Sequence, residues 1–264
     1  MIIGVDMGAS AVKICALEGD RVAFTHYEHG RGGDMPALLE RLGLDAAGAE
    51  LIALTGLSAK NSGLERLGAP VKYIPEPEAI GEGACWLTGR DDLIVASIGT
   101  GTAFVHAKGG RYIHLCGTGV GGGTLKGLAV KVLGVANMRE FDSLAMAGDC
   151  GRVDLLIGDF VESYGILDPE ITASNLARLN PEASREDWAA GLANLVLQII
   201  GTMSLLACTS SGAAGVAVIG ALAGTEPSRA NFATFERVYG KSFLIPEHSA
   251  CATAIGAARR ARCV

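Results

Sequence analysis

The sequence predicts an α/β protein built from a duplicated unit, with a cleft between the two halves. Each half opens on three short strands joined by glycine turns, over residues 1–27 and again over residues 92–117. Helical stretches and further strands follow each triplet, and a glycine-containing hairpin joins the first two strands of both halves. We therefore expect two lobes, residues 1–91 and 92–264, with the last helix (about 249–264) as a candidate for packing back on the first lobe.

The first half reads as three strands, a helix, two strands and a second helix. Alternating apolar residues and glycine turns predict the strands at 1–8, 10–19 and 20–27. A helix is expected at 34–43, with Asp34 as its N-cap and Gly43 as its stop. Buried strands at 50–56 and 70–76 follow, and a helix at 77–87 begins with Pro77 at its first position.

The second half repeats the pattern and then becomes mainly helical. Its long helix, at about 185–210, carries Ser184 as its cap and Asp187 three residues on, which is a capping-box arrangement. The other elements expected here are strands at 92–99, 102–110, 111–117, 215–224 and 241–247, and helices at 123–133, 138–147, 154–164, 229–239 and 249–262.

Composition limits the functional class. The chain of 264 residues is 49% hydrophobic and 19% charged, which is typical of a globular protein. A net charge of −6 argues against a nucleic-acid or membrane partner, because both kinds of surface attract basic patches. The apolar segment 191–208 approaches the length of a membrane span. Polar residues interrupt it at nearly helical spacing, so we expect a buried core helix instead.

Cysteine usage points to the cytoplasm. The seven cysteines form no CxxC pair and no metal-ligand spacing. A dispersed, odd-numbered set is typical of reduced thiols in a cytoplasmic protein. The first residues read directly as a strand, without a basic segment or a cleavage site, so no signal peptide is expected.

The stretch "DMGAS" after the first strand is the first candidate phosphate site. On the functional interpretation, Asp6 directs its carboxylate toward the hydration shell of Mg²⁺, while Gly8 lets the backbone approach a phosphate and Ser10 donates to it. Lys13 follows just beyond and is assigned to the same site. The alternative is an ordinary β-turn, which a D-x-G sequence alone does not exclude.

The stretch "GTGT" occupies the same place in the second half. It consists of Gly99, Thr100, Gly101 and Thr102. A single hairpin of this kind is ordinary, but two of them facing each other across a cleft would hold a triphosphate from both sides. We therefore interpret this run as a phosphate clamp rather than a plain turn.

Two further glycine-rich stretches are candidates for ligand contact. The run "GTGVGGG" at residues 117–123 precedes a helix, where free N–H groups and the helix dipole favour an anion. Its alternative is a flexible connection, although its closing residues Gly121, Gly122 and Gly123 suggest close approach of a ligand or a neighbouring backbone. Gly220, in "VIGALAG", either admits an adenosine group or serves helix packing.

Glu76 is the candidate general base. It follows a strand and directly precedes Pro77, and glutamate is not a favoured N-cap residue. A carboxylate at this position would accept the proton of a substrate hydroxyl, and the helix dipole would keep it ionised.

These segments resemble the type II pantothenate kinases of the actin-like, sugar-kinase-like ATPase superfamily. The resemblance lies in "DMGASAVKI", "SIGTGTAF" and "GTGVGGGTLKGL", and it extends to "AGDCGRVDLLIGDF", "ITASNLARL" and "HSACATAIGAA". It implies a duplicated ribonuclease H-like fold, a homodimer, and phosphorylation of the primary hydroxyl of pantothenate by ATP and Mg²⁺. It also implies that Glu76 is the catalytic base.

The sequence departs from the family at two substrate positions. Where the family usually carries a serine after the second hairpin this chain has Ala103, and where it carries an arginine this chain has His114. Together with Gly117 and Thr118, these residues are assigned to the acceptor. Because a histidine is mostly neutral at pH 7, pantetheine or a sugar stays open as the acceptor. A dehydratase activator and a nucleotide-binding protein without kinase activity stay open as functions.

Overall fold

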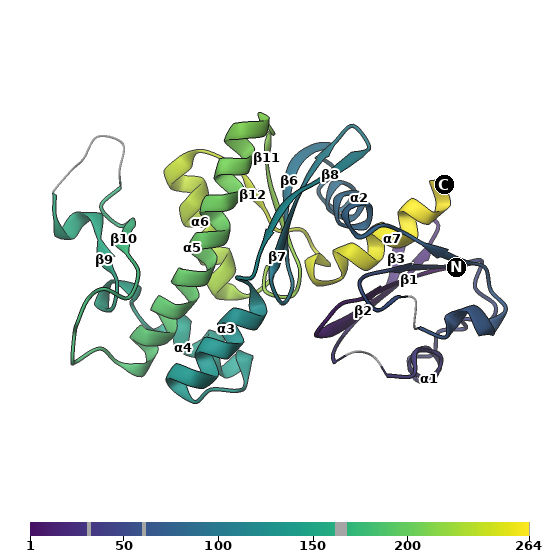
Figure 1. Ribbon diagram of the computed structural model, residues 1–264, viewed down its shortest axis with the longest axis horizontal. Coiled ribbons are helices and arrows are strands. Elements are labelled where there is room, and N and C mark those ends of the chain that lie inside the picture. Colours follow the sequence, from purple (N-terminus) through teal and green to yellow (C-terminus); the bar gives the residue numbers. More distant parts are fainter. Residues whose placement is uncertain (31–32, 60–61, 162–167, 264) are drawn as a thin grey trace.

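Two five-stranded sheets form the two lobes of the molecule. The computed structural model describes residues 1–30, 33–59, 62–161 and 168–263. The strand orders are β3-β2-β1-β4-β5 and β12-β11-β6-β7-β8. The sheets lie side by side along the long axis, and a small β9-β10 hairpin lies at the end farthest from the chain termini (Figure 1).

The first sheet is built from β1 (Ile2–Met7), β2 (Ala11–Glu18), β3 (Arg21–His29), β4 (Leu51–Thr55) and β5 (Val71–Tyr73). β1 pairs antiparallel with β2 and parallel with β4. On one face, alternate residues of β1 such as Ile3 and Val5 pack in a core with helix α1 (Met35–Arg41). On the other face, Ile2 packs in a core with the C-terminal helix.

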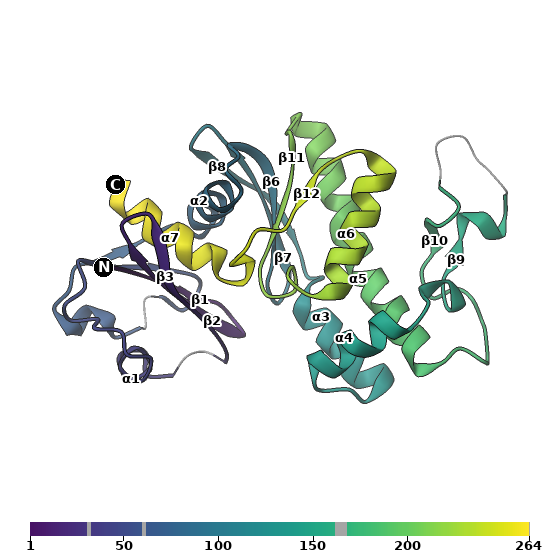
Figure 2. The same ribbon diagram turned by 180° about the vertical axis from the view of Figure 1, so that it is seen from behind.

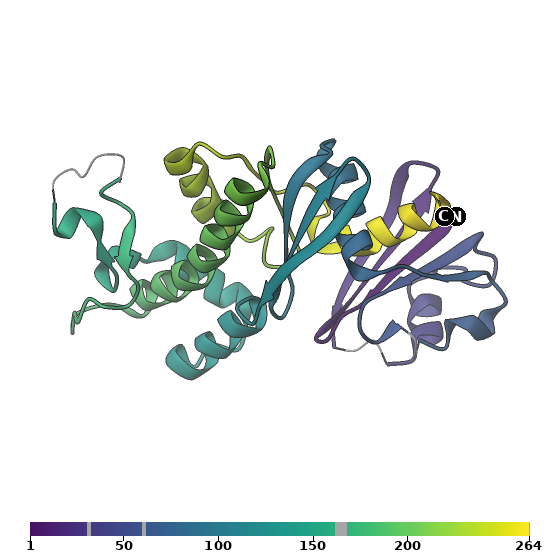
Figure 3. The ribbon, with the colours of Figure 1, turned by 45° about the horizontal axis from the view of Figure 1, so that its top comes forward.

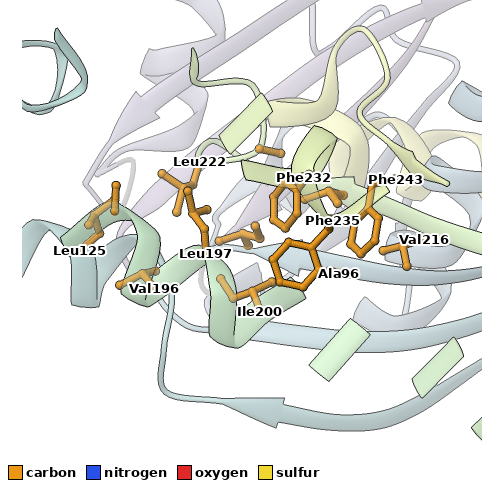
Figure 4. Close-up of a cluster of buried hydrophobic side chains, with 14 of the residues drawn as sticks. Ala96, Leu125, Val196, Leu197, Ile200, Val216, Leu222, Phe232, Phe235 and Phe243 are labelled. Carbon is orange, nitrogen blue, oxygen red and sulfur yellow. The ribbon is translucent and has the colours of Figure 1, made fainter. Parts of the chain in front are cut away.

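The second sheet is built from β6 (Asp92–Ile98), β7 (Thr102–Lys108), β8 (Arg111–Thr118), β11 (Gly215–Ile219) and β12 (Phe243–Leu244). Helices α5 (Arg185–Ser211) and α6 (Glu226–Tyr239) cover one of its faces. There, Phe232 and Phe243 stack and Phe235 fills the space beside Ile200 (Figure 4). This is the largest hydrophobic core of the molecule.

The two lobes exchange one helix each. Helix α2 (Glu76–Thr88) precedes the second sheet in sequence yet packs on it through Ile80 and Ala84. Helix α7 (Ala252–Cys263) follows the second sheet yet packs on the first through Ala254 and Ile255. Both chain ends therefore lie at the first lobe (Figures 2 and 3).

Small residues let α2 and α7 cross with their backbones in contact. A Cβ at Gly83 would overlap the carbonyl oxygen of Ala252, and one at Gly256 would overlap that of Ala79. Ion pairs flank the crossing, from Arg260 to Glu78 and from Arg259 to Glu82. The crossing is therefore the main connection between the lobes.

Several local expectations are confirmed. Asp34 caps α1 by accepting from the N–H of Ala37, and the capping box of Ser184 and Asp187 begins α5. Among the described residues α5 is the one helix long and apolar enough to cross a membrane, and 50% of its most apolar window is buried. Its inner face contributes Leu197 and Ile200 to the core, as expected of a core helix.

The helix expected at 154–164 is wrong over its described part, since residues 162–164 lie outside the described residues. Leu155–Leu156 form strand β9, which pairs with β10 (Thr172–Ser174), and a short turn of 3₁₀ helix follows at Ile157–Asp159. The reason lies in Asp154, which is fully buried and accepts hydrogen bonds from the N–H of Leu176 and the side chain of Asn194. These distant partners determine the local conformation.

Candidate functional site

A cleft of about 680 Å³ lies between the two lobes. Its wall contains residues of both glycine hairpins, of the glycine-rich run and of the β11 end, together with the first residue of α2. The sequence-predicted residues that line it are Asp6, Gly8, Ser10, Lys13, Glu76, Gly99, Thr100, Gly101, Thr102, Ala103, Thr118, Gly122, Gly123 and Gly220. Three predicted residues, His114, Gly117 and Gly121, stand outside this lining.

A row of polar side chains crosses the first sheet beside the cleft. Asp6 pairs in register with Thr55 of β4 and Lys13 of β2, and Lys13 pairs with Tyr27 of β3. In-register neighbours share one face of a sheet, so these four side chains are on the face that carries α7. Lys13 Nζ lies 3.1 Å from Asp6 Oδ2. Burial raises the pKa of the Asp6 carboxyl, and Lys13 acts in the opposite direction.

The two glycine hairpins meet across the cleft. The side-chain oxygens of Ser10 and Thr100 lie 2.6 Å apart and share a hydrogen bond. In the first hairpin, the N–H of Gly8 donates to the carbonyl of Ala11, which closes a tight turn. Both hydroxyls thus stand where a ligand in the cleft would contact the two lobes at once.

The N–H groups of the glycine-rich run are not free, which corrects the expectation of an open anion site there. Those of Gly122 and Gly123 donate to the carbonyls of Gly99 and Thr100, each at 2.9 Å. A Cβ at Gly121 would lie 2.7 Å from the backbone of Gly101. Close backbone packing between this run and the second hairpin therefore explains the glycines, and the run supports that hairpin from behind.

Gly220 ends β11 with a φ of +100°, a conformation that other residues rarely adopt. A Cβ here would overlap the carbonyl oxygen of Ile98, so the turn after β11 lies directly against the end of β6. Gly220, Ala221 and Leu222 continue the cleft wall on the side of α3 (Gly122–Leu128) and α4 (Met138–Ala147).

Glu76 is the first residue of α2, after Pro75 at the N-cap position. Burial raises the pKa of its carboxyl, nearby Asp6 raises it further, and Lys13 and His114 lower it. The expectation that the helix dipole keeps this group ionised is therefore incomplete, because burial is the larger influence. A more basic carboxylate is better suited to accept a proton.

The acceptor candidates share one face of the second sheet. Ala103 packs with the core beneath α2, and His114 pairs in register with Val105 of the same core. His114 is exposed, yet its ring is close enough to influence the carboxyl of Glu76. Gly117 pairs with Ala103 on β8. Glu76 and His114 thus flank the region where an acceptor would lie.

The sequence analysis missed several cleft residues. Tyr27 and His29 line it from β3, with their rings in edge contact at 5.2 Å. Lys126, Met138 and Asp142 line it from α3 and α4. Alternation along β3 could have placed Tyr27 and His29 on one sheet face. The second group belongs to helices whose inward face no local pattern marks.

The donor set fits a magnesium ion that keeps most of its ligands from water and phosphate. Among the described residues no group of three or more His, Cys, Asp or Glu side chains could hold a metal ion. A single buried carboxylate, Asp6, stands beside the hydroxyls of Ser10 and Thr100. Mg²⁺ typically binds through one or two carboxylates together with substrate phosphates.

Sequence comparisons give the family. The model of the Fumble family matches residues 92–254. A type II pantothenate kinase of Oceanobacillus iheyensis is 28% identical over 265 residues, which cover 97% of each chain. A type II pantothenate kinase of Bacillus cereus is also 28% identical, over 77% of this chain and 76% of that one.

Solved structures give the fold. The activator of the 2-hydroxyisocaproyl-CoA dehydratase from Clostridium difficile with bound ADPNP has a TM-score of 0.70 and 18% identity, and the match covers 98% of this chain and 93% of that one. A ROK family glucokinase from Streptomyces griseus in complex with glucose and AMPPNP has a TM-score of 0.57 and 16% identity, with 100% and 99% covered. The predicted duplicated ribonuclease H-like fold with two lobes is confirmed.

Proposed function

Since the chain belongs to the Fumble family, we propose that it is a type II pantothenate kinase. It transfers the terminal phosphoryl group of ATP to the primary hydroxyl of pantothenate, the first step of coenzyme A synthesis. The observation that carries this proposal is the meeting of Glu76, Asp6 and Lys13 beside two glycine hairpins that face each other across one cleft. Curated relatives of nearly the same length support it.

Glu76 acts as the general base in this proposal. Its carboxylate takes the proton of the acceptor hydroxyl as the oxygen approaches the phosphorus atom. General-base assistance of this kind is worth about 10²–10⁴-fold in rate. The raised pKa of Glu76 and its position at the cleft wall support this role.

The two hairpins hold the triphosphate. The hydroxyls of Ser10 and Thr100, which now bond to each other, turn to phosphate oxygens, and the small residues Gly8, Gly99 and Gly101 let the chain approach. Lys13 offsets negative charge on the phosphates. When bound, Mg²⁺ supplies charge neutralisation, and Asp6 holds it through its hydration shell.

The nucleoside lies on the opposite side of the hairpins from Glu76. Glu76 and Ala103 are on the α2 face of the second sheet, whereas Lys126, Met138 and Asp142 belong to helices on the other face. A phosphate chain that passes between the hairpins therefore leads the adenosine group toward α3, α4 and Gly220.

A related acceptor is the second candidate, and His114 is the observation that favours it. An arginine offers a fixed cationic fork for a carboxylate, and an exposed histidine offers much less. Pantetheine lacks the carboxylate of pantothenate but keeps its primary hydroxyl. A sugar, or no acceptor at all as in an activator or a regulatory homologue, are the outcomes that a panel of acceptors separates.

We further propose a division into lobes at residues 1–91 and 92–264, a homodimer and a cytoplasmic location. The homodimer follows from the family resemblance, and the location follows from the seven dispersed cysteines.

An acceptor panel tests the proposed function. Purified protein with Mg-ATP is given pantothenate, pantetheine and a set of sugars separately, and ADP release is measured for wild type and Glu76→Gln. Turnover with pantothenate that falls at least about 100-fold in the variant supports the proposal. Turnover with pantetheine or a sugar alone would move the acceptor, and ATP binding without turnover on any compound would contradict a kinase.

A further inference from the structure

Thr55 is a buried polar residue beside the cleft that the proposed reaction has not used. It is the last residue of β4 and its exposed fraction is 2%. Its hydroxyl oxygen is enclosed and finds no hydrogen-bond partner within the described part of the chain. Because an enclosed hydroxyl without a partner destabilises a fold, it is retained only where it serves another purpose.

The carboxylate of Asp6 lies next to Thr55 and has one oxygen to offer. Asp6 and Thr55 are in-register partners on adjacent parallel strands, so their side chains share one sheet face. Lys13, on the opposite neighbour strand, pairs with Oδ2 of Asp6 at 3.1 Å. Oδ1 is directed the other way, since a Cβ at Gly56 would lie 2.8 Å from it.

We propose that Thr55 is a positioning residue whose hydroxyl donates a hydrogen bond to Oδ1 of Asp6 when Mg-ATP is bound. With Lys13 on one oxygen and Thr55 on the other, the carboxylate is fixed in the plane that faces the hydration shell of the cation. This inference rests on the proposed function, because Asp6 faces a cation only in that reaction.

Two features make the contact attainable. Threonine reorients its hydroxyl by moving between staggered χ1 rotamers, without a change in the backbone. Gly56, whose φ is +92°, follows Thr55 and leaves the space next to Oδ1 free of a side chain. Carboxylates that hold metals are generally oriented by such outer donors, and loss of one typically lowers metal affinity 10- to 100-fold.

Thr55→Val and Thr55→Ser test the proposal without any acceptor. Calorimetry follows ATP binding at increasing Mg²⁺, and the melting temperature of the ligand-free protein is measured separately. We expect Thr55→Val to melt at or above the wild-type temperature, because it removes an unpaired hydroxyl without changing the shape. The same variant should need about tenfold or more Mg²⁺ for half-maximal ATP binding. Thr55→Ser keeps the hydroxyl and should restore the wild-type Mg²⁺ dependence.

A matched threonine provides the stability control. Thr102 is also buried at a strand end, but its hydroxyl donates to the carbonyl of Val120 at 2.8 Å. Thr102→Val should therefore lower the melting temperature where Thr55→Val does not.

Two results would overturn the proposal. A wild-type Mg²⁺ dependence in Thr55→Val would do so, and so would an equal loss in Thr55→Ser. A wild-type protein that binds Mg-ATP but fails to phosphorylate pantothenate would contradict the proposed acceptor and leave this comparison unaffected.

Discussion

At the scale of single residues, the environment of Glu76 determines when it can act as a base. Burial and the nearby Asp6 raise the pKa of its carboxyl above the ordinary value. Only the deprotonated form accepts a proton, so kcat/KM should be lost as the pH falls through this raised pKa. The acid limb should therefore lie above about pH 4.3, where an exposed glutamate titrates.

The pH profile of kcat/KM for wild type and Glu76→Gln measures this. The residual rate of the variant should lack the acid limb. If the variant kept the same limb, another group, such as Asp6, would govern the profile.

His114 determines how well the site receives a carboxylate. Replacement by arginine, as in His114→Arg, adds a fixed positive fork beside Glu76. For an acceptor that carries a carboxylate, a charged hydrogen bond of about 1.5 kcal/mol lowers KM about tenfold. The KM for pantothenate should therefore fall, whereas the KM for pantetheine should not.

Steady-state kinetics on both compounds checks this expectation, and His114→Gln serves as the neutral control. Equal effects on both acceptors would show that His114 does not face the carboxylate.

At the scale of elements, the crossing of α2 and α7 depends on glycine. In Gly83→Ala the new Cβ would meet the carbonyl of Ala252, which is backbone and cannot rotate away. Overpacking of this kind costs about 1–3 kcal/mol in the free energy of unfolding. Gly127 in α3 is a matched control, because a Cβ there would meet nothing within 4 Å. Gly127→Ala should stabilise by about 0.5–1 kcal/mol, since alanine favours a helix.

Urea unfolding measures both variants. Equal effects in the two would contradict the tight packing of the crossing.

Asp154 organises the segment that holds β9 and β10. Its buried carboxylate accepts from Thr172, Asn175, Leu176 and Asn194. Asp154→Ala would leave these donors unpaired, at about 1–3 kcal/mol for each buried one. We expect a lower melting temperature and faster hydrogen exchange at the N–H of Leu176.

Asp45→Ala is the control for this prediction. Asp45 is exposed and accepts one hydrogen bond, from the N–H of Gly48. It should change the melting temperature little. An unchanged exchange rate at Leu176 in Asp154→Ala would show that the segment is held by other contacts.

Local signals predicted most elements correctly, and they failed where distant partners decide. The cap of Asp34 and the box of Ser184 and Asp187 involve neighbours in sequence, so their patterns were readable. The conformation after Asp154 depends on donors from β10 and α5, which no local pattern reveals. Likewise, the N–H groups of Gly122 and Gly123 are occupied by the second hairpin, which lies well before them in the chain.

At the scale of the whole molecule, duplication was readable and the exchange of helices was not. Three strands with a glycine hairpin recur in both halves, and this repeat predicted two lobes around a cleft that now contains most of the predicted site residues. Which sheet a helix covers depends on its apolar face, and α2 and α7 each cover the sheet of the other half. Consequently, the lobes are joined at the crossing of these helices and meet again at Ser10 and Thr100.

Identification of the reaction product tests the central claim most directly. Wild-type protein is incubated with Mg-ATP and pantothenate, and phosphorus NMR and mass spectrometry follow the acceptor. The account predicts a phosphomonoester of pantothenate in an amount equal to the ADP formed, and almost none with Glu76→Gln. ADP without phosphorylated pantothenate, or a phosphomonoester formed only on another acceptor, would contradict it.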